Sequence, residues 1–151
     1  MRYSEFWKNK RVLVTGHTGF KGSWLTSWLI EMGASVWGYS LEPELDQNLF
    51  KEIKKNLPEK SFTHSYGNIN DFSKLKKFVN NSSPDIVFHL AAQPLVLKSY
   101  SEPIKTWETN VIGSLNVLEA LSDLRKICAV VMVTTDKVYK NKEWIFGYRE
   151  N

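Results

Sequence analysis

The stretch RVLVTGHTGFKG, residues Arg11 to Gly22, joins a short apolar run to three evenly spaced glycines. The run Val12–Val14 is typical of a strand, and the glycines that follow it are Gly16, Gly19 and Gly22. In a tight strand-to-helix turn, the free N–H groups at the helix N-terminus favour a diphosphate. Glycine is needed there because a Cβ would block the approach of the phosphate or of the helix. The stretch predicts a dinucleotide-binding loop.

The spacing G-x-x-G-x-x-G is one residue wider in its first gap than the usual dinucleotide fingerprint. A glycine triplet alone is also compatible with an ordinary turn that ends in a glycine cap. The flanking sequence favours the binding loop, because a strand-like run precedes it and a helical pattern follows it. Phe20 and Lys21 lie inside the loop, so we predict that they contact the cofactor together with the three glycines.

Strand-like and helix-like segments alternate from one end of the chain to the other. The predicted strands are Arg11–Thr15, Ser35–Ser40, Ser61–Tyr66, Asp85–Leu90 and Ala129–Thr134. The predicted helices are Phe20–Met32, Leu49–Asn56, Asp71–Asn80 and Pro103–Leu124, and the residues after Lys137 read as a loop. Such alternation is typical of an α/β fold in which helices cover both faces of a parallel sheet. We therefore predict a Rossmann-like, doubly wound domain with about five strands.

Two apolar stripes at helical spacing suggest which helix faces are buried. In the first predicted helix the stripe is formed by Trp24, Leu25, Trp28 and Leu29, and we assign the two tryptophans to the core. In the long predicted helix the stripe is formed by Val111, Leu115, Leu118 and Leu121. His89 lies in a strand and is interpreted as a packed residue, whereas His17 in the glycine loop is expected to bond locally.

Composition excludes several classes of function. The net charge of +4 is spread along 151 residues, and no basic stripe with interleaved aromatic residues suggests nucleic-acid binding. No apolar run approaches the roughly 20 residues that a membrane helix requires. The single cysteine, Cys128, shares no ligand spacing with a histidine, so we predict no metal site. One cysteine and no signal-peptide pattern favour a reducing, cytoplasmic compartment.

The end of the second predicted strand bears on the choice of cofactor. Dinucleotide-binding folds usually hold the ribose hydroxyls with an acidic residue at this position. Here the residue is Ser40, and Glu42 lies two positions further on as an alternative. No Arg or Lys occurs between residues 40 and 50 to pair with a 2′-phosphate. The sequence favours NAD over NADP.

Five segments, in order along the chain, resemble the motifs of the extended short-chain dehydrogenase/reductase family. They are Thr15–Gly22 (its TGxxGxxG loop), Gly67–Asp71 (GDIRD), His89–Pro94 (HLAAQ), Thr109–Ser114 (TNVxGT) and Thr134–Tyr139 (the end of the fifth strand in nucleotide-sugar 4,6-dehydratases). Each motif is weak alone, but five in register are specific. The resemblance implies a bound NAD and a cytoplasmic enzyme that acts on a nucleotide sugar.

The resemblance also assigns cofactor contacts to the later motifs. Asn68 stands where the family binds adenine, with an amide in place of the usual carboxylate, and Ile69 follows it. The segment beneath the cofactor contains Leu90, Ala91, Ala92 and Gln93. Asn110, a polar residue on an apolar helix, is expected to support the site and to need partners of its own.

Within the family, the sequence Thr135-Asp136-Lys137 is similar to the branch that dehydrates CDP-glucose, because the branch acting on dTDP-glucose has glutamate at the lysine position. The resemblance implies that NAD oxidises C4, that water leaves across C5–C6 and that the hydride returns to C6. Thr135 would bond the sugar O4, Asp136 would be the general acid, and Lys137 the C5 base or enolate stabiliser. A solvated pair after a strand is the alternative, but open α/β sheets bind ligands at this edge.

The family oxidises C4 with a Tyr-x-x-x-Lys pair, and no such pair follows Asp136 in this sequence. We expect residues 1–151 to be an incomplete NAD(P)-binding Rossmann domain that lacks the substrate-binding part and is inactive alone. Family members commonly form homodimers through the long helix, so self-association is expected. Two other readings stay open: another dehydratase or epimerase of the family, and a non-catalytic NAD-binding module.

Overall fold

The computed structural model describes residues 3–44, 48–126 and 128–150, and it contains one parallel sheet. The strands are β1 (Arg11–Thr15), β2 (Ser35–Ser40), β3 (Phe62–Tyr66), β4 (Ile86–His89) and β5 (Ala129–Met132). Their order in the sheet is β3-β2-β1-β4-β5, and every neighbouring pair is parallel. The order reverses direction at β1, between β2 and β4, which is where open sheets of this kind bind ligands. The predicted Rossmann-like sheet is confirmed.

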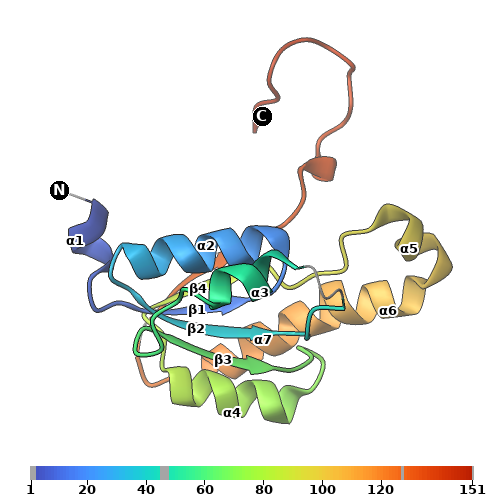
Figure 1. Ribbon diagram of the computed structural model, residues 1–151. Helices are drawn as coiled ribbons and strands as arrows, with labels where there is room; N and C mark the ends of the chain where they lie inside the picture. The colour runs from blue at the N-terminus through green and yellow to red at the C-terminus, as the bar shows by residue number, and fades with distance from the viewer. Residues whose placement is uncertain (1–2, 45–47, 127, 151) are drawn as a thin grey trace.

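Helices lie on both faces of the sheet (Figure 1). The helical segments are α1 (Tyr3–Trp7), α2 (Phe20–Glu31), α3 (Leu49–Lys54), α4 (Phe72–Ser82), α5 (Val96–Ser101), α6 (Pro103–Trp107), η1 (Glu108–Gly113), α7 (Ser114–Ser122) and η2 (Asp136–Val138). Helices α2 and α3 cover one face, and α4 and α7 cover the other (Figure 1). Helices α1 and α5 were not predicted, because each is only five or six residues long and lacks a repeating apolar pattern.

Alternate residues of the strands point into two separate cores. Leu13 and Val87 pack with Val79 and Val117 beneath α4 and α7. Val12, Val14 and Val36 pack on the opposite face against Leu29 of α2. Because β1 is buried on both faces, its continuous apolar run is what a central parallel strand requires.

The predicted inward face of α2 is correct at Leu29, which is buried, and wrong at the two tryptophans. The side chains that face the sheet are Gly22, Ser23, Thr26, Leu29 and Ile30. Trp24 and Trp28, which we assigned to the core, are 57% and 65% exposed. Helix α2 approaches the glycine loop so closely that only small residues fit its first turns, and these residues are polar or lack a side chain. The two tryptophans therefore lie on the outer face of α2, whereas Leu29 and Ile30 in its later turns reach the core.

The long predicted helix is present, but it is divided by a π-helical turn. Segments α6, η1 and α7 follow one another without a break, and η1 has i→i+5 hydrogen bonding. Such a turn contains an extra residue, which rotates the buried face relative to a regular helix. Val117, Ala120 and Leu121 are buried, whereas Val111, Leu115 and Leu118 are between 44% and 57% exposed. Of the predicted stripe, only Leu121 reaches the core.

Within the ranges that the structure describes, no helix has the length and apolar character needed to cross a membrane.

Candidate functional site

A pocket of about 590 Å³ lies at the carboxyl ends of the strands. Gly16, Leu41, Gly67, Leu90 and Val133, each the first residue after its strand, all line it. Eleven of the predicted cofactor residues line this pocket: Gly16, Gly19, Phe20, Lys21, Gly22, Ser40, Asn68, Ile69, Leu90, Ala91 and Ala92. Segments from both halves of the sheet therefore meet at the edge where the sequence predicted a dinucleotide.

Two glycines of the loop are required by the fold itself. Gly16 has φ +77°, donates its N–H to the Tyr39 carbonyl at 2.9 Å, and would place a Cβ 2.7 Å from the backbone nitrogen of Ala91. A Cβ on Gly22 would lie 2.1 Å from the Gly16 carbonyl oxygen. These contacts involve backbone atoms, which have little freedom to move. The first turn of α2 is thereby held against the loop and against the end of β4.

The middle glycine differs from the other two. Gly19 is the N-cap of α2 with φ −73°, and a Cβ there would meet only the Gly16 carbonyl oxygen, at 3.4 Å. Neither strain nor crowding therefore demands glycine at this position. Gly19 offers no side-chain cap, so N–H groups in the first turn of α2 remain available for an anion. Lys21 is the only charged residue among the described residues that line the pocket.

At the end of β2, Ser40 is oriented by the loop. The Thr18 hydroxyl lies 2.9 Å from the Leu41 carbonyl and 2.8 Å from the Ser40 hydroxyl. A carbonyl oxygen only accepts, so Thr18 donates its proton to Leu41 and Ser40 donates to Thr18. The lone pairs of Ser40 are then left to accept a hydrogen bond from a ligand. Ser40 lines the pocket, whereas Glu42, the other candidate, is exposed and does not.

Asn68 sits in a tight turn at the far side of the pocket. Its side-chain oxygen accepts the Asn70 N–H at 2.9 Å, and its backbone carbonyl accepts the Tyr39 hydroxyl at 3.2 Å. Burial, assisted by the charge of Asp71, raises the pKa of Tyr39 to about 12, so that this hydroxyl remains a donor. The amide of Asn68 is thus held in place with its nitrogen and one oxygen lone pair free of these bonds.

Gln93 and Asn110, predicted to bind the cofactor, lie beside the pocket rather than among its lining residues. The Asn110 side chain accepts the Gln93 N–H at 2.8 Å and donates to the Gln93 carbonyl at 3.1 Å. Asn110 belongs to the π-helical turn η1, whose preceding residue, Thr109, does line the pocket. Asn110 thus has the partners that we expected it to need. These partners belong to the segment that follows β4.

The three predicted catalytic residues follow β5 at the rim of the pocket. Val133 and Thr134 line the pocket, and Thr135 comes next. Thr135 and Lys137 are exposed, and the Thr135 hydroxyl accepts the Lys137 N–H at 3.2 Å. Asp136 begins the 3₁₀ turn η2. The structure therefore places the start of the triplet next to the pocket, and neither Thr135 nor Lys137 is among the lining residues.

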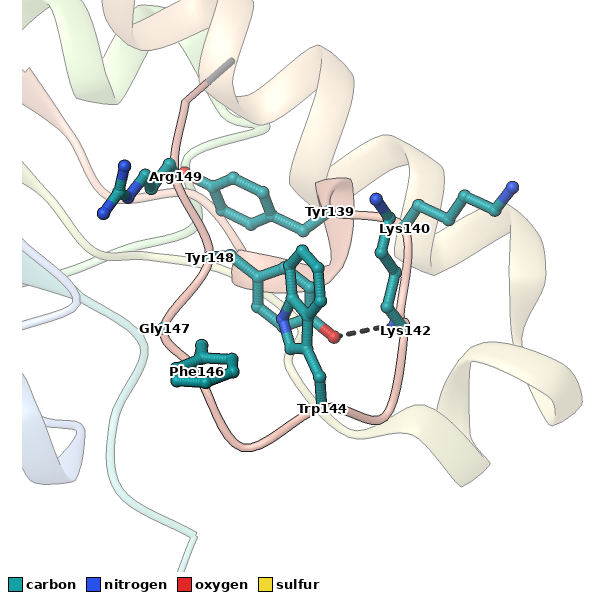
Figure 2. Close-up of a pocket in the computed structure, with 8 residues that line it drawn as sticks. All are labelled: Tyr139, Lys140, Lys142, Trp144, Phe146, Gly147, Tyr148 and Arg149. Carbon is teal, nitrogen blue, oxygen red and sulfur yellow. Dashed lines mark hydrogen bonds between the residues drawn. The ribbon is translucent and has the colours of Figure 1, made fainter.

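A second cavity, of about 790 Å³, lies within the C-terminal segment (Figure 2). Tyr139 and Tyr148 stack with ring centroids 5.7 Å apart, and the Tyr148 hydroxyl accepts the Lys142 N–H at 2.8 Å. Trp144 contacts Tyr148 and lies under the Lys142 ammonium. This segment extends away from the layers of the domain (Figure 1), and neither tyrosine is among the residues that line the pocket at the strand ends. We do not include this cavity in the candidate site.

Sequence reasoning missed seven residues that line the pocket: Thr18, Leu41, Gly67, Pro94, Thr109, Val133 and Thr134. Each is adjacent to a predicted site residue or within one residue of a predicted motif. The signal available was position alone, since parallel strands present the first residues after their carboxyl ends to one edge.

His17 was expected to bond locally, and the structure contradicts this. Its ring is fully buried, and neither ring nitrogen makes a well-formed hydrogen bond to a described residue, the Tyr39 backbone being a weak polar contact. The ring packs between Phe50, Phe62 and His64, with centroids 4.8, 5.8 and 5.3 Å away. Burial first, and the neighbouring His64 second, lower the pKa of His17 to about 3. The His17 ring is therefore neutral and fills the space between the glycine loop and these aromatic residues.

Comparison with known proteins identifies the family. The model of the GDP-mannose 4,6 dehydratase family matches residues 13–146. A curated relative, CDP-glucose 4,6-dehydratase of Salmonella typhimurium, is 51% identical over 146 residues, which cover 97% of this chain and 40% of the relative. The chain thus spans about two fifths of the length of this relative.

Solved structures agree on the fold. The epimerase Mth375 of Methanothermobacter thermautotrophicus aligns with a TM-score of 0.79 and 29% identity, covering 99% of this chain and 42% of that one. MoeE5, solved in complex with UDP-glucose and NAD, aligns with a TM-score of 0.69 and 28% identity, covering 89% of this chain and 40% of that one. With the family match over most of the chain, the chain belongs to the GDP-mannose 4,6 dehydratase family of extended short-chain dehydrogenases/reductases.

Proposed function

We propose that the pocket at the carboxyl ends of the strands binds NAD. The observation that carries this proposal is Gly19, a glycine that neither backbone strain nor internal packing requires, placed at the uncapped N-terminus of a twelve-residue helix. A ligand approaching the backbone explains the missing side chain. Helix α2 and Lys21 would favour the negative charge of a diphosphate. The similar structure of MoeE5, which was solved with NAD bound, supports this choice.

Ser40 is the proposed ribose contact, and its environment favours NAD over NADP. Its hydroxyl donates to Thr18, so it accepts from a ribose hydroxyl but offers no positive charge to a 2′-phosphate. We expect Ser40→Ala to weaken NAD binding about tenfold, the effect of one lost hydrogen bond at a partly desolvated site. Glu42→Gln is the matched control and should leave affinity within twofold. Calorimetric titration measures both, and equal losses in the two variants would contradict the assignment.

We further propose that the parent activity is the dehydration of CDP-glucose to its 4-keto-6-deoxy product. The support is the 51% identity to the Salmonella enzyme and the triplet Thr135-Asp136-Lys137 at the rim of the pocket. When bound, NAD⁺ supplies the hydride acceptor at C4. Thr135 would orient the sugar O4, Asp136 would protonate the departing C6 hydroxyl, and Lys137 would take the C5 proton or stabilise the enolate. The pair Asp136-Lys137 favours a dehydratase over an epimerase.

The test uses the 151-residue chain in two measurements. We expect saturable binding of NAD by calorimetry, and weaker binding of NADP. We expect no conversion of CDP-glucose, followed by the absorbance of the 4-keto sugar in alkali, because residues 137–151 contain no Tyr-x-x-x-Lys pair to oxidise C4. Absence of NAD binding would refute the cofactor proposal. Robust turnover would refute the proposal that this chain binds the cofactor without catalysing the dehydration alone.

Self-association is proposed as well. Val111, Leu115 and Leu118 form an exposed apolar stripe along η1 and α7, and no described element covers it. A stripe of this size is costly to leave in water and favours pairing with a second copy. Sedimentation velocity should show a dimer at micromolar concentration, and a monomer throughout would contradict this.

The lone free thiol, Cys128, is compatible with a reducing cytoplasm.

A further inference from the structure

A continuous chain of hydrogen bonds runs through His89 at the end of β4. His89 Nδ1 lies 2.6 Å from the Thr15 hydroxyl, and His89 Nε2 lies 3.0 Å from the Ser114 hydroxyl. The Ser114 hydroxyl is 2.8 Å from the Asn110 carbonyl, and the Ala91 N–H donates to the Thr15 hydroxyl at 3.3 Å. This chain of hydrogen bonds therefore links β1, the segment after β4 and the helix that contains the π turn.

The direction of the chain follows from its two hydroxyl groups. The Asn110 carbonyl only accepts, so the single proton of Ser114 is donated to it. The Ser114 oxygen must then accept a hydrogen bond from His89, which places a proton on Nε2. This end of the chain selects the Nε2–H form of the ring.

The other end selects the same form. Thr15 is fully buried, and its oxygen accepts the Ala91 N–H, so its own proton needs an acceptor. His89 Nδ1, at 2.6 Å, is the acceptor that the described residues provide. With the proton on Nδ1 instead, the buried Thr15 proton would have no acceptor there, at the cost of an unsatisfied donor. Burial lowers the pKa of His89, which agrees with a neutral ring.

We propose that His89 is a positioning residue for the cofactor site, held as the neutral Nε2–H tautomer at the centre of a one-directional hydrogen-bond chain from Ala91 to Asn110. The proposal rests on the proposed binding of NAD. Thr15 immediately precedes Gly16, and Ala91 is the residue packed against Gly16. At its far end the chain holds Asn110, which clamps the backbone of Gln93 from both sides.

The spacing between the glycine loop and the segment Leu90–Gln93 is thereby set by one side chain. Both segments contribute residues to the pocket. A ring with one acceptor and one donor on opposite sides fits between two hydroxyl groups whose protons point the same way along the chain. A side chain that matches only one of the two hydroxyls leaves the other segment unanchored.

The tautomer is tested directly by ¹⁵N NMR of the histidine-labelled chain, without cofactor, at pH 7.5. We expect His89 Nε2 to carry a proton with resolved one-bond coupling, and Nδ1 to resonate as an unprotonated acceptor. Proton attachment at Nδ1, alone or together with Nε2, overturns the proposal. This measurement does not depend on NAD, so it separates a failure here from a failure of the proposed function.

The positioning role is tested with a matched pair of serines on α7. Ser114→Ala removes the acceptor of Nε2–H, whereas Ser122, whose hydroxyl donates to the Glu119 carbonyl, serves as the control. We expect Ser114→Ala to weaken NAD binding about tenfold, with binding restored by Ser114→Thr, and Ser122→Ala to bind like the unmodified chain. Equal affinities for Ser114→Ala and Ser122→Ala overturn the positioning role.

Discussion

Gly22→Ala will strongly destabilise the domain, whereas Gly19→Ala will leave the fold intact and abolish tight NAD binding. The two glycines are three residues apart in one loop, yet they are required for different reasons. A Cβ on Gly22 would lie 2.1 Å from the Gly16 carbonyl oxygen, and Gly16 itself is packed against the Ala91 backbone. Neither backbone segment has room to retreat, so α2 would have to separate from the sheet.

The expected cost of Gly22→Ala is on the order of 4 kcal/mol or more, the range of severe overpacking in a core. For a domain of this size that loss lowers the melting temperature by roughly 10 °C or more. Thermal unfolding followed by circular dichroism measures it. A melting temperature within a few degrees of that of the unmodified chain would show that the loop relaxes, and would contradict the packing described above.

The Gly19→Ala variant has ordinary space for its Cβ, 3.4 Å from the Gly16 carbonyl oxygen, and an ordinary φ of −73°. We expect its stability to stay within about 1 kcal/mol, since only a helix N-cap preference changes. Its affinity for NAD should fall on the order of a hundredfold, because the new methyl group occupies the approach of the diphosphate. Gly147→Ala, where nothing lies within 4 Å, controls for the substitution itself. Unchanged NAD affinity for Gly19→Ala would refute the proposed cofactor site.

The strands could be predicted because burial on both faces leaves continuous apolar runs in the sequence. The observed bounds of β1 and β2 are those predicted, and both strands are almost fully buried. The site residues of the motifs could also be placed, because residues that follow parallel strands converge on one edge. Eleven of thirteen predicted cofactor residues line one pocket for that reason.

Side-chain orientation could not be predicted in the same way. The periodicity of Trp24 and Trp28 is genuine, but the close approach of α2 to the loop reserves its inner face for Gly22, Ser23 and Thr26. The π turn at η1 is equally invisible, because no residue type marks an added residue in a helix. In both helices the local pattern is overruled by a backbone contact that forms only in the folded chain.

The environment of His17 also forms only in the folded chain, and it leads to the second large predicted effect, a loss of stability in acid. The ring lies in the glycine loop, fully buried, without a well-formed hydrogen bond to a described residue and with its pKa lowered to about 3. In the unfolded chain its pKa returns to 6.5. Between these two values the unfolded state binds one more proton than the folded state, so acid favours unfolding. The stability that neutral His17 permits is complete above pH 6.5 and is lost as the pH falls toward 3.

Between pH 7.5 and 5.5 the contribution of His17 to this loss is about 1.4 kcal/mol, the free energy of one proton over one pH unit below 6.5. His17→Phe should remove it, since phenylalanine keeps an aromatic ring in the cluster of Phe50, Phe62 and His64 and cannot be protonated. Urea unfolding of both chains at the two pH values gives the comparison. At pH 7.5 we expect the variant to lie within about 1.5 kcal/mol of the unmodified chain, because the two unsatisfied ring nitrogens are replaced by carbon while the ring volume is nearly kept.

His64→Phe is the control that assigns the effect. Burial also lowers the pKa of His64, but its ring is only half-buried, stacked on Phe62 at 5.2 Å. We expect His64→Phe to keep most of the pH dependence and His17→Phe to lose about 1.4 kcal/mol of it. A larger loss of pH dependence in His64→Phe than in His17→Phe would show that His17 is not the buried neutral group. His17 lies between Gly16 and Gly19, so protonation that expels its ring also deforms the glycine loop. As the pH is lowered, NAD affinity should therefore decrease in the unmodified chain and decrease less in His17→Phe.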